Sequence, residues 1–174
     1  CIILDSSSSR AFCAGADVVT LQREILQSEG NNRYYADAFF SHEYRLDHLI
    51  HVIKKPIICW GNGIVMGGGL GLLSGCSHRV GTVSTKLAMP EITIGLFPDA
   101  GGTKFLGNLP DQLGWFLGLT GCHLTPSDGL ALGLIDIIVD EAHKEELFNS
   151  LCNIEWAGDN LENIAKVSSV IKEF

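Results

Sequence analysis

Three consecutive glycines, Gly67 to Gly69, head an apolar segment and restrict what that part of the chain can form. A glycine run at the start of a helix lets the backbone approach another group closely and leaves N–H groups without partners inside the helix. A phosphate-binding loop would need a lysine after the glycines, and a dinucleotide fingerprint that began at Gly61 would need glycine, not Met66, as its sixth residue. The triplet therefore approaches either a packed neighbour or a ligand, such as a carbonyl oxygen.

Two acids follow the triplet in an otherwise apolar stretch. Glu91 comes directly after Pro90, and Asp99 comes directly after Pro98. Their apolar neighbours are Ile92, Ile94, Leu96 and Phe97. We expect these neighbours to bury the two acids partly, which would raise their pKa values and suit them to proton transfer near neutral pH. The alternative is that both are solvated surface acids, as most Asp and Glu residues are.

A second turn of small residues, Ala14-Gly15-Ala16, precedes an expected helix. Two such turns in one domain could each contribute one backbone N–H to a shared oxyanion hole. Close packing of the backbone explains a small-residue turn equally well. The sequence leaves both interpretations open.

Strand and helix patterns alternate along the chain, which predicts the α/β class. We expect strands at residues 1–5, 56–60, 79–83 and 134–140. We expect helices at residues 17–28, 35–52, 70–76 and 111–119, a further helix from Thr125, and helical structure from Glu141 onward. Residues 29–34 are predicted to form a loop. We take residues 1–140 as a core and residues 141–174 as a helical extension of the same domain.

Particular residues predict where these helices begin and end, and which face they bury. Asp17 is expected to cap the first helix or to lie in its first turn, and Thr125 is expected to cap another whose first residue is Pro126. Gly121 is expected to close helix 111–119. The apolar residues that recur at helical spacing along helix 35–52 and just beyond it are Phe39, Phe40, Tyr44, Leu46, Leu49, Ile50 and Ile53.

Composition excludes several classes of function. The chain is 46% hydrophobic and only 18% charged, so it is not a disordered chain, and its net charge of −8 argues against a nucleic-acid partner. No apolar run reaches the ~18 residues of a membrane span. The six histidines lack metal-binding spacings, and the six cysteines are scattered, so we expect no metal site and interpret the cysteines as small buried side chains in a reducing compartment.

Three further residues have no clear link to chemistry. From the residues alone, His42 and Glu43 are interpreted as structural or exposed positions of helix 35–52. Trp60 is expected in the core, because it ends a short apolar strand.

A series of motifs in the same order resembles the crotonase (enoyl-CoA hydratase/isomerase) superfamily. The segments that carry the resemblance are residues 11–17, 55–58, 62–63, 66–69, 90–95 and 101–102. The resemblance runs from residue 1 to about residue 140, and it implies a spiral of ββα turns acting on acyl-CoA thioesters. Members of that superfamily usually begin with a further ββα unit. Because this chain opens inside a strand without an initiator methionine, we expect a fragment that lacks the first unit and the C-terminal helices.

The resemblance also implies roles for particular residues. Backbone N–H groups of Ala16 and Gly68 should form the oxyanion hole, while Phe12, Ala14 and Gly67 should contribute to substrate binding, with the turn from Phe12 to Ala16 lining the adenine pocket of CoA. Hydratases of this superfamily carry a glutamate two residues after the triplet, and here that position is Gly71. One remaining glutamate cannot run a two-carboxylate addition of water, so hydration is not expected.

Asp99 points to a particular branch of the superfamily. The stretch from Met89 to Gly102 resembles 3-hydroxyisobutyryl-CoA hydrolases, which carry a Glu and an Asp eight residues apart. The stretch from Phe40 to Leu46 resembles the same branch and assigns Glu43 to substrate binding. The resemblance implies that Glu91 and Asp99 are catalytic.

The expected reaction is hydrolysis of a short hydroxyacyl-CoA, above all 3-hydroxyisobutyryl-CoA in valine breakdown. Glu91 or Asp99 would act as general base for water, or Glu91 would attack and form an anhydride; the sequence allows both routes. No metal or redox cofactor is expected, because CoA is part of the substrate. The alternatives are another crotonase reaction, namely enoyl-CoA hydratase or isomerase chemistry, and a non-catalytic CoA-binding protein. A homo-oligomer (dimer, trimer or hexamer) and either a bacterial cytoplasm or a mitochondrial matrix fit the resemblance.

Overall fold

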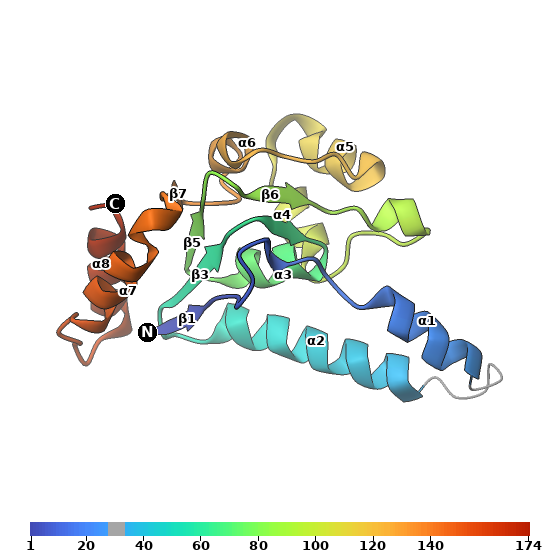
Figure 1. Cartoon of the computed structure of the whole chain (residues 1–174), viewed down its shortest axis with the longest axis horizontal. Helices are drawn as coiled ribbons and strands as arrows, with labels where there is room; N and C mark the ends of the chain where they lie inside the picture. The colour runs from blue at the N-terminus through green and yellow to red at the C-terminus, as the bar shows by residue number, and fades with distance from the viewer. Residues whose placement is uncertain (28–33) are drawn as a thin grey trace.

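The structure is a computed structural model that describes residues 1–27 and 34–174 (Figure 1). Its strands are β1 (Ile2–Leu4), β2 (Ala11–Cys13), β3 (Ile57–Gly61), β4 (Ile64–Met66), β5 (His78–Gly81), β6 (Lys86–Ala88) and β7 (Ile137–Ile138). Its helices are α1 (Val18–Gln27), α2 (Tyr34–Val52), α3 (Gly68–Gly75), α4 (Gly102–Gly107), α5 (Leu113–Thr120), α6 (Pro126–Ala131), α7 (Lys144–Cys152) and α8 (Asn160–Ile171). Short 3₁₀ helices are η1 (Glu91–Ile94), η2 (Pro110–Gln112) and η3 (Glu141–His143).

The strands form two parallel sheets, and successive strands of the chain alternate between them. One sheet has the order β1-β3-β5-β7 and the other has the order β2-β4-β6. After each of the first three pairs of strands the chain runs through helical structure before it returns to the first sheet. This repetition is the predicted spiral of ββα turns, so the predicted α/β class and fold are confirmed.

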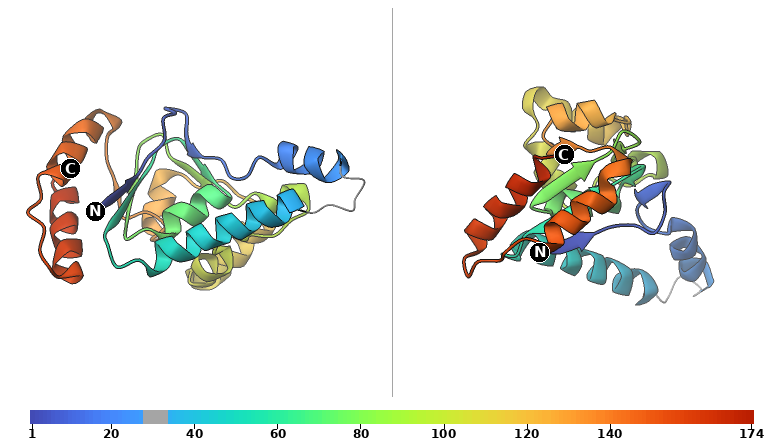
Figure 2. Two further views of the ribbon diagram at one scale, coloured as in Figure 1. Left: turned by 90° about the horizontal axis from the view of Figure 1, so that it is seen from below. Right: turned by 60° about the vertical axis from the view of Figure 1, so that its left-hand side comes forward.

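The main core lies between the sheets and the helices that follow them. Leu70 and Leu73 of α3 are almost completely buried, together with Val65 of β4 and Leu87 of β6. A second cluster joins Trp60 of β3 to α7 and α8, which form a layer on one side of the molecule (Figure 2). Trp60 is 1% exposed, which confirms its predicted place in the core.

The predicted helix ends are confirmed. The side chain of Asp17 accepts a hydrogen bond from the backbone N–H of Thr20 at the start of α1. Thr125 and Asp128 form a reciprocal capping box at the start of α6. Gly121 adopts a left-handed conformation with φ of 63° and ends α5.

Several predicted boundaries were wrong. The strands β2, β4 and β6 were not predicted, because three residues are too few to show a period of two. Helix α3 begins at Gly68 rather than at residue 70, and the strand predicted over 134–140 is only Ile137–Ile138. Tyr34 belongs to α2, not to a loop. Residues 29–33 of that predicted loop, and residue 28 of the predicted helix 17–28, lie outside the described residues.

Two predictions of burial were also wrong in part. Cys59 and Cys76 are buried, but Cys1, Cys122 and Cys152 are exposed free thiols. On α2, the residues of the expected apolar face that are exposed are Tyr44, Leu46 and Leu49. Ile50 is the α2 residue that the structure buries in the core. Within the described residues, no helix combines the length and apolarity needed to cross a bilayer.

Candidate active site

The glycine triplet forms the turn between β4 and α3. Gly67 has φ of 56° and ψ of −129°, a conformation that a side chain would make strongly unfavourable. Its backbone N–H donates to the carbonyl of Ala88 in β6. Gly68 is the first residue of α3, so its N–H has no partner within the helix and lies at the positive end of the helix dipole.

The turn that contains Gly15 lies against this helix start. A Cβ atom placed on Gly15, whose φ is 91°, would be 3.6 Å from the backbone nitrogen of Gly68 and 3.4 Å from the carbonyl oxygen of Met66. Ala16 follows directly. Within residues 1–27 and 34–174, no turn or loop hydrogen bond between backbone groups uses the N–H of Ala16 or of Gly68. The two distant turns therefore meet, and the oxyanion-hole role of their N–H groups stays a prediction.

Close packing explains the remaining glycine of the triplet. A Cβ atom on Gly69 would collide with the backbone carbonyl of Cys13 in β2. Gly69 thus allows α3 to touch the second sheet, while Gly67 and Gly68 lie against carboxyl oxygens of Glu91 and Glu43. Close packing is therefore confirmed for Gly69, and approach of a ligand to Gly67 and Gly68 stays a prediction.

Glu91 is a buried carboxyl group that faces the head of α3. It is 8% exposed, and its Oε1 lies 2.9 Å from the position of a Cβ atom on Gly67. Its Oε2 is buried and has no hydrogen-bond partner in the described part of the chain. Burial raises the pKa of Glu91; its own backbone N–H opposes this shift, and the charge of Asp99 adds to it. Burial therefore favours the protonated form of this carboxyl group.

Asp99 is half-buried and is held by a residue of α2. The hydroxyl of Tyr44 donates to Oδ2 of Asp99 over 2.7 Å. Both residues line a cavity of about 330 Å³, which also includes Asp47 and the loop from Phe97 to Gly101. The structure therefore places Asp99 at the edge of an open space beside α2.

Glu43 of α2 lies closer to the triplet than sequence reasoning from the residues alone suggested. A Cβ atom on Gly68 would collide with Oε1 of Glu43. Burial raises the pKa of Glu43 to about 7, and the charges of Asp99 and Asp47 add to the shift. Glu43 and Glu91 thus flank the Gly67–Gly68 peptide from different elements. His42, the preceding residue, is exposed, which agrees with its expected role.

Sequence reasoning missed Asp47 and Tyr44. Both oxygens of the Asp47 carboxylate are buried, and neither has a hydrogen-bond partner among the described residues. Burial raises the pKa of Asp47 to about 6, and the charge of Asp99 adds to the shift. One feature of the sequence could have pointed to Asp47: it lies four residues after Glu43, and this spacing places both acids on one side of a helix.

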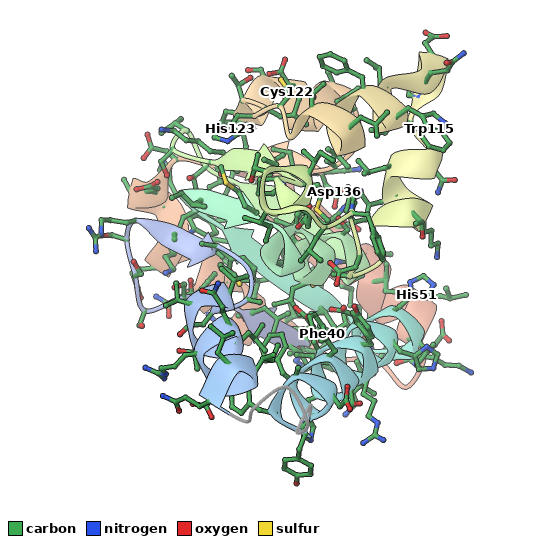
Figure 3. All side chains as sticks on the ribbon, turned by 90° about the vertical axis from the view of Figure 1, so that its right-hand side faces the viewer. Phe40, His51, Trp115, Cys122, His123 and Asp136 are labelled. Carbon is green, nitrogen blue, oxygen red and sulfur yellow. The ribbon has the colours of Figure 1, made fainter. Side chains whose placement is uncertain are left out.

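The predicted partial burial of Glu91 and Asp99 is confirmed, but their apolar neighbours are not buried with them. The apolar neighbours Ile92, Ile94, Leu96 and Phe97 are all exposed, and Phe97 is 72% exposed. Three of them line a separate apolar cavity of about 500 Å³, together with Trp115 of α5 (Figure 3). The buried carboxyl group of Glu91 lies against the glycine turn.

The remaining predicted site residues lie near the Gly15 turn. Ala14 is exposed, whereas Phe12 is half-buried and packs against the main core. Their part in binding the adenine of CoA stays a prediction. No group of three potential metal ligands occurs in the described part of the chain.

Gly71 occupies the position of the second glutamate expected in hydratases. A Cβ atom there would be 2.6 Å from Cβ of Ala100 and 2.5 Å from its carbonyl oxygen. Ala100 has φ of 43°, a left-handed conformation that is uncommon for alanine. A side chain at position 71 would therefore require the segment around Ala100 to move.

The chain belongs to the enoyl-CoA hydratase/isomerase family, whose model matches residues 1–174. The match confirms the resemblance and extends past residue 140 to the end of the chain. The chain is also similar to a solved enoyl-CoA hydratase from Rhodobacter sphaeroides, with a TM-score of 0.81 and 29% identity over 99% of this chain and 56% of that one.

Within the family, curated relatives point to the predicted branch. The chain is 40% identical to 3-hydroxyisobutyryl-CoA hydrolase 1 of Arabidopsis thaliana over 88% of its length and 40% of the relative's. It is 39% identical to the mitochondrial 3-hydroxyisobutyryl-CoA hydrolase of Homo sapiens over 95% of its length and 42% of the relative's. It is 41% identical to the small ribosomal subunit protein mS47 of Neurospora crassa over 71% of its length and 24% of the relative's. The chain spans about two fifths of the length of the two hydrolases.

Proposed function

We propose that the protein hydrolyses the thioester of a short hydroxyacyl-CoA, with 3-hydroxyisobutyryl-CoA as the first candidate. The observation that carries the proposal is the buried carboxyl group of Glu91 beside Gly67, at the amino-terminal end of α3. A helix start with free N–H groups stabilises a developing oxyanion, and an adjacent carboxylate can activate water. Similarity to the curated hydrolases supports the choice of substrate.

The proposed reaction places the thioester carbonyl oxygen against the N–H groups of Ala16 and Gly68. In one route, Glu91 or Asp99 takes a proton from water while the water oxygen bonds to the carbonyl carbon, the C–S bond breaks, and CoA leaves as a thiolate that is then protonated. In the other, a Glu91 oxygen attacks the carbonyl carbon, CoA leaves, and water opens the resulting anhydride. Loss of one oxyanion donor typically lowers kcat by ~10²–10³.

In this proposal, Asp99, Glu43 and the turn from Phe12 to Ala16 also bind the substrate. The carboxyl groups of Asp99 and Glu43 form hydrogen bonds with the substrate hydroxyl. The turn from Phe12 to Ala16 contacts the adenine of CoA. No metal or redox cofactor takes part, and CoA enters only as part of the substrate.

The test is steady-state hydrolysis of 3-hydroxyisobutyryl-CoA, followed by release of free thiol, with the wild type and the Glu91→Gln variant. We expect thiol release by the wild type and a loss of at least about 10²-fold in kcat for the variant. Glu145→Gln on α7, an exposed acid outside the site, is the matched control. Double-bond absorbance changes with enoyl-CoA substrates and without thiol release would instead identify hydratase or isomerase chemistry.

A second candidate is a CoA-binding protein without turnover. The similarity to a protein named as a component of the small ribosomal subunit favours keeping this candidate. Titration calorimetry with CoA distinguishes the two: binding of CoA, with no hydrolysis of any acyl-CoA by the wild type, would support the second candidate and contradict the first.

We further propose that the protein forms a homo-oligomer and acts in a mitochondrial matrix or, if its source is bacterial, in the cytoplasm. The exposed apolar residues around Phe97 and Trp115 support self-association, and the relative from Homo sapiens is described as mitochondrial. Sedimentation at several protein concentrations tests the assembly, and fractionation of the source cells tests the compartment.

A further inference from the structure

We propose that Tyr44 is a positioning residue that fixes the orientation of the Asp99 carboxylate in the site. The inference rests on the hydrolase function proposed above. It starts from a contact between α2 and the loop after η1, which joins residues 55 positions apart in the chain. Tyr44 is not among the residues to which the sequence assigned a role.

In the part of the chain that the structure describes, the hydrogen bond from Tyr44 is the one polar contact that holds the Asp99 side chain. Within residues 1–27 and 34–174, no other group donates a hydrogen bond to the Asp99 carboxylate, and no lysine, arginine or histidine forms an ion pair with it. The neighbouring acids Glu43, Asp47 and Glu91 each have their pKa raised in part by the charge of Asp99. The Asp99 carboxylate therefore lies among three other acids and is held by one phenol.

The Tyr44 side chain is held in place and keeps its proton. The ring of Tyr44 packs against Phe40, one turn earlier on α2, with ring centres 5.8 Å apart; Figure 3 labels Phe40. Burial and the hydrogen bond to Asp99 raise the pKa of Tyr44 above its ordinary value, so the hydroxyl stays protonated and continues to donate.

The contact leaves one oxygen of Asp99 available. Oδ2 accepts the hydrogen bond from Tyr44, so Oδ1 can meet a water molecule or the substrate hydroxyl. Without the phenol, the carboxylate would rotate among several conformers, and only a fraction of them would suit the reaction. Catalysis is sensitive to such misplacement of a reacting group.

The test is the Tyr44→Phe variant, which keeps the ring and removes only the hydroxyl. Hydrogen bonds to charged groups contribute about 1.5–3 kcal/mol, so we expect kcat to fall by roughly 10- to 100-fold while KM changes by less than about threefold. Tyr35→Phe, an exposed tyrosine at the start of the same helix, is the matched control and should leave both constants unchanged. Unchanged kcat in Tyr44→Phe would overturn the inference.

A double-mutant cycle separates positioning from a general structural role. In the Asp99→Asn background, Tyr44→Phe should lower kcat by less than about threefold, because the group it orients has already been changed. A loss as large as in the wild-type background would contradict the inference. Circular dichroism of all variants shows whether each is folded.

A readout that does not depend on activity keeps this inference separate from the proposed function. The ultraviolet titration of Tyr44 is obtained as the difference between the wild type and Tyr44→Phe. We expect this phenol to ionise at lower pH in Asp99→Asn than in the wild type, because its charged acceptor is gone. Identical titrations of Tyr44 in the two proteins would overturn the inference. If the titration shifts but the protein hydrolyses no acyl-CoA, the contact between Tyr44 and Asp99 is supported and the hydrolase function is contradicted.

Discussion

The carboxyl group of Glu43 lies against the backbone of Gly68, the first residue of α3. An anion at this place competes with any negative charge that develops on a substrate oxygen bound by the Gly68 N–H. Because burial and the charges of Asp99 and Asp47 raise the pKa of Glu43 to about 7, the group changes charge near neutral pH. The charge state of Glu43 should therefore control how well the helix start stabilises an oxyanion.

The first prediction concerns the pH dependence of activity. As the pH rises through about 7, Glu43 ionises, and we expect kcat/KM for the acyl-CoA to fall. In Glu43→Gln this alkaline limb should disappear, while Glu145→Gln should retain it. Measurement of kcat/KM across the pH range decides the matter, and a limb that persists unchanged in Glu43→Gln would refute the role of this side chain.

The second prediction concerns Asp47 and the free energy of unfolding. Its pKa is raised from an ordinary value of 3.8 to about 6, so the folded state holds the proton more tightly than the unfolded state. The associated stability is present at low pH and is lost as the pH rises through about 6. Asp47→Asn should therefore stabilise the protein by about 1 kcal/mol at pH values well above 6, allowing for partial exposure, and much less at pH values near 4.

Thermal melts at both pH values test this prediction. A gain of about 1 kcal/mol corresponds to a rise in Tm of roughly 2–4 °C for a chain of this size. Asp37→Asn, an exposed acid on the same helix, should change Tm little at either pH. A variant Asp47→Asn that is less stable than the wild type at both pH values would show that the carboxylate has a stabilising partner.

The third prediction concerns the glycine turn. Gly67→Ala places a methyl group 2.9 Å from Oε1 of Glu91 and forces alanine into a conformation with φ of 56°. We expect a loss of about 1–3 kcal/mol in unfolding free energy and a strong loss of kcat, because Glu91 must move. Gly95→Ala, with φ of 76° and no atom within 4 Å of its added methyl group, should lower stability but leave kcat nearly unchanged. Equal kinetic effects of the two substitutions would contradict the proposed contact.

The fourth prediction compares activity and stability at Glu91. Burial raises its pKa, and its Oε2 has no partner among the described residues, so the ionised form is held in the folded protein at an energetic cost. Glu91→Gln should lower kcat by about 10²–10⁴-fold and, at pH values above the raised pKa of Glu91, leave Tm equal or higher. Steady-state kinetics and thermal melts on the same preparation show whether kcat falls while Tm stays equal or rises. A fall in both kcat and Tm would instead indicate that Glu91 stabilises the fold.

Local sequence patterns predicted much of the framework. The period and length of the apolar pattern suffice to predict α2, β3 and the buried Trp60. A long amphipathic segment or a strongly apolar one can bury its apolar side chains in few ways. The capping box of Thr125 depends only on residues within one turn, so it too was predictable. The glycine triplet and Gly15 marked the two turns that meet at the head of α3.

The surroundings of the acids required the folded structure. Ile92, Ile94, Leu96 and Phe97 suggested that apolar neighbours bury Glu91, yet all four are exposed. A chain position does not reveal which side of a 3₁₀ turn faces the protein. The three-residue strands were missed for a related reason, because their stability comes from parallel hydrogen bonds to distant strands.

The sequence by itself determined the family, the strands β1, β3 and β5, the helices α1, α2, α5 and α6, and the two glycine turns, since each depends on residues near one another or on motifs at fixed spacing. Only the tertiary structure decided that Glu43, Tyr44 and Asp47 of α2 gather around Asp99 and the start of α3. That arrangement depends on how α2 packs across α3 and on the path of the loop after η1. Such contacts between distant segments follow from the whole core, so no local pattern of residues specifies them.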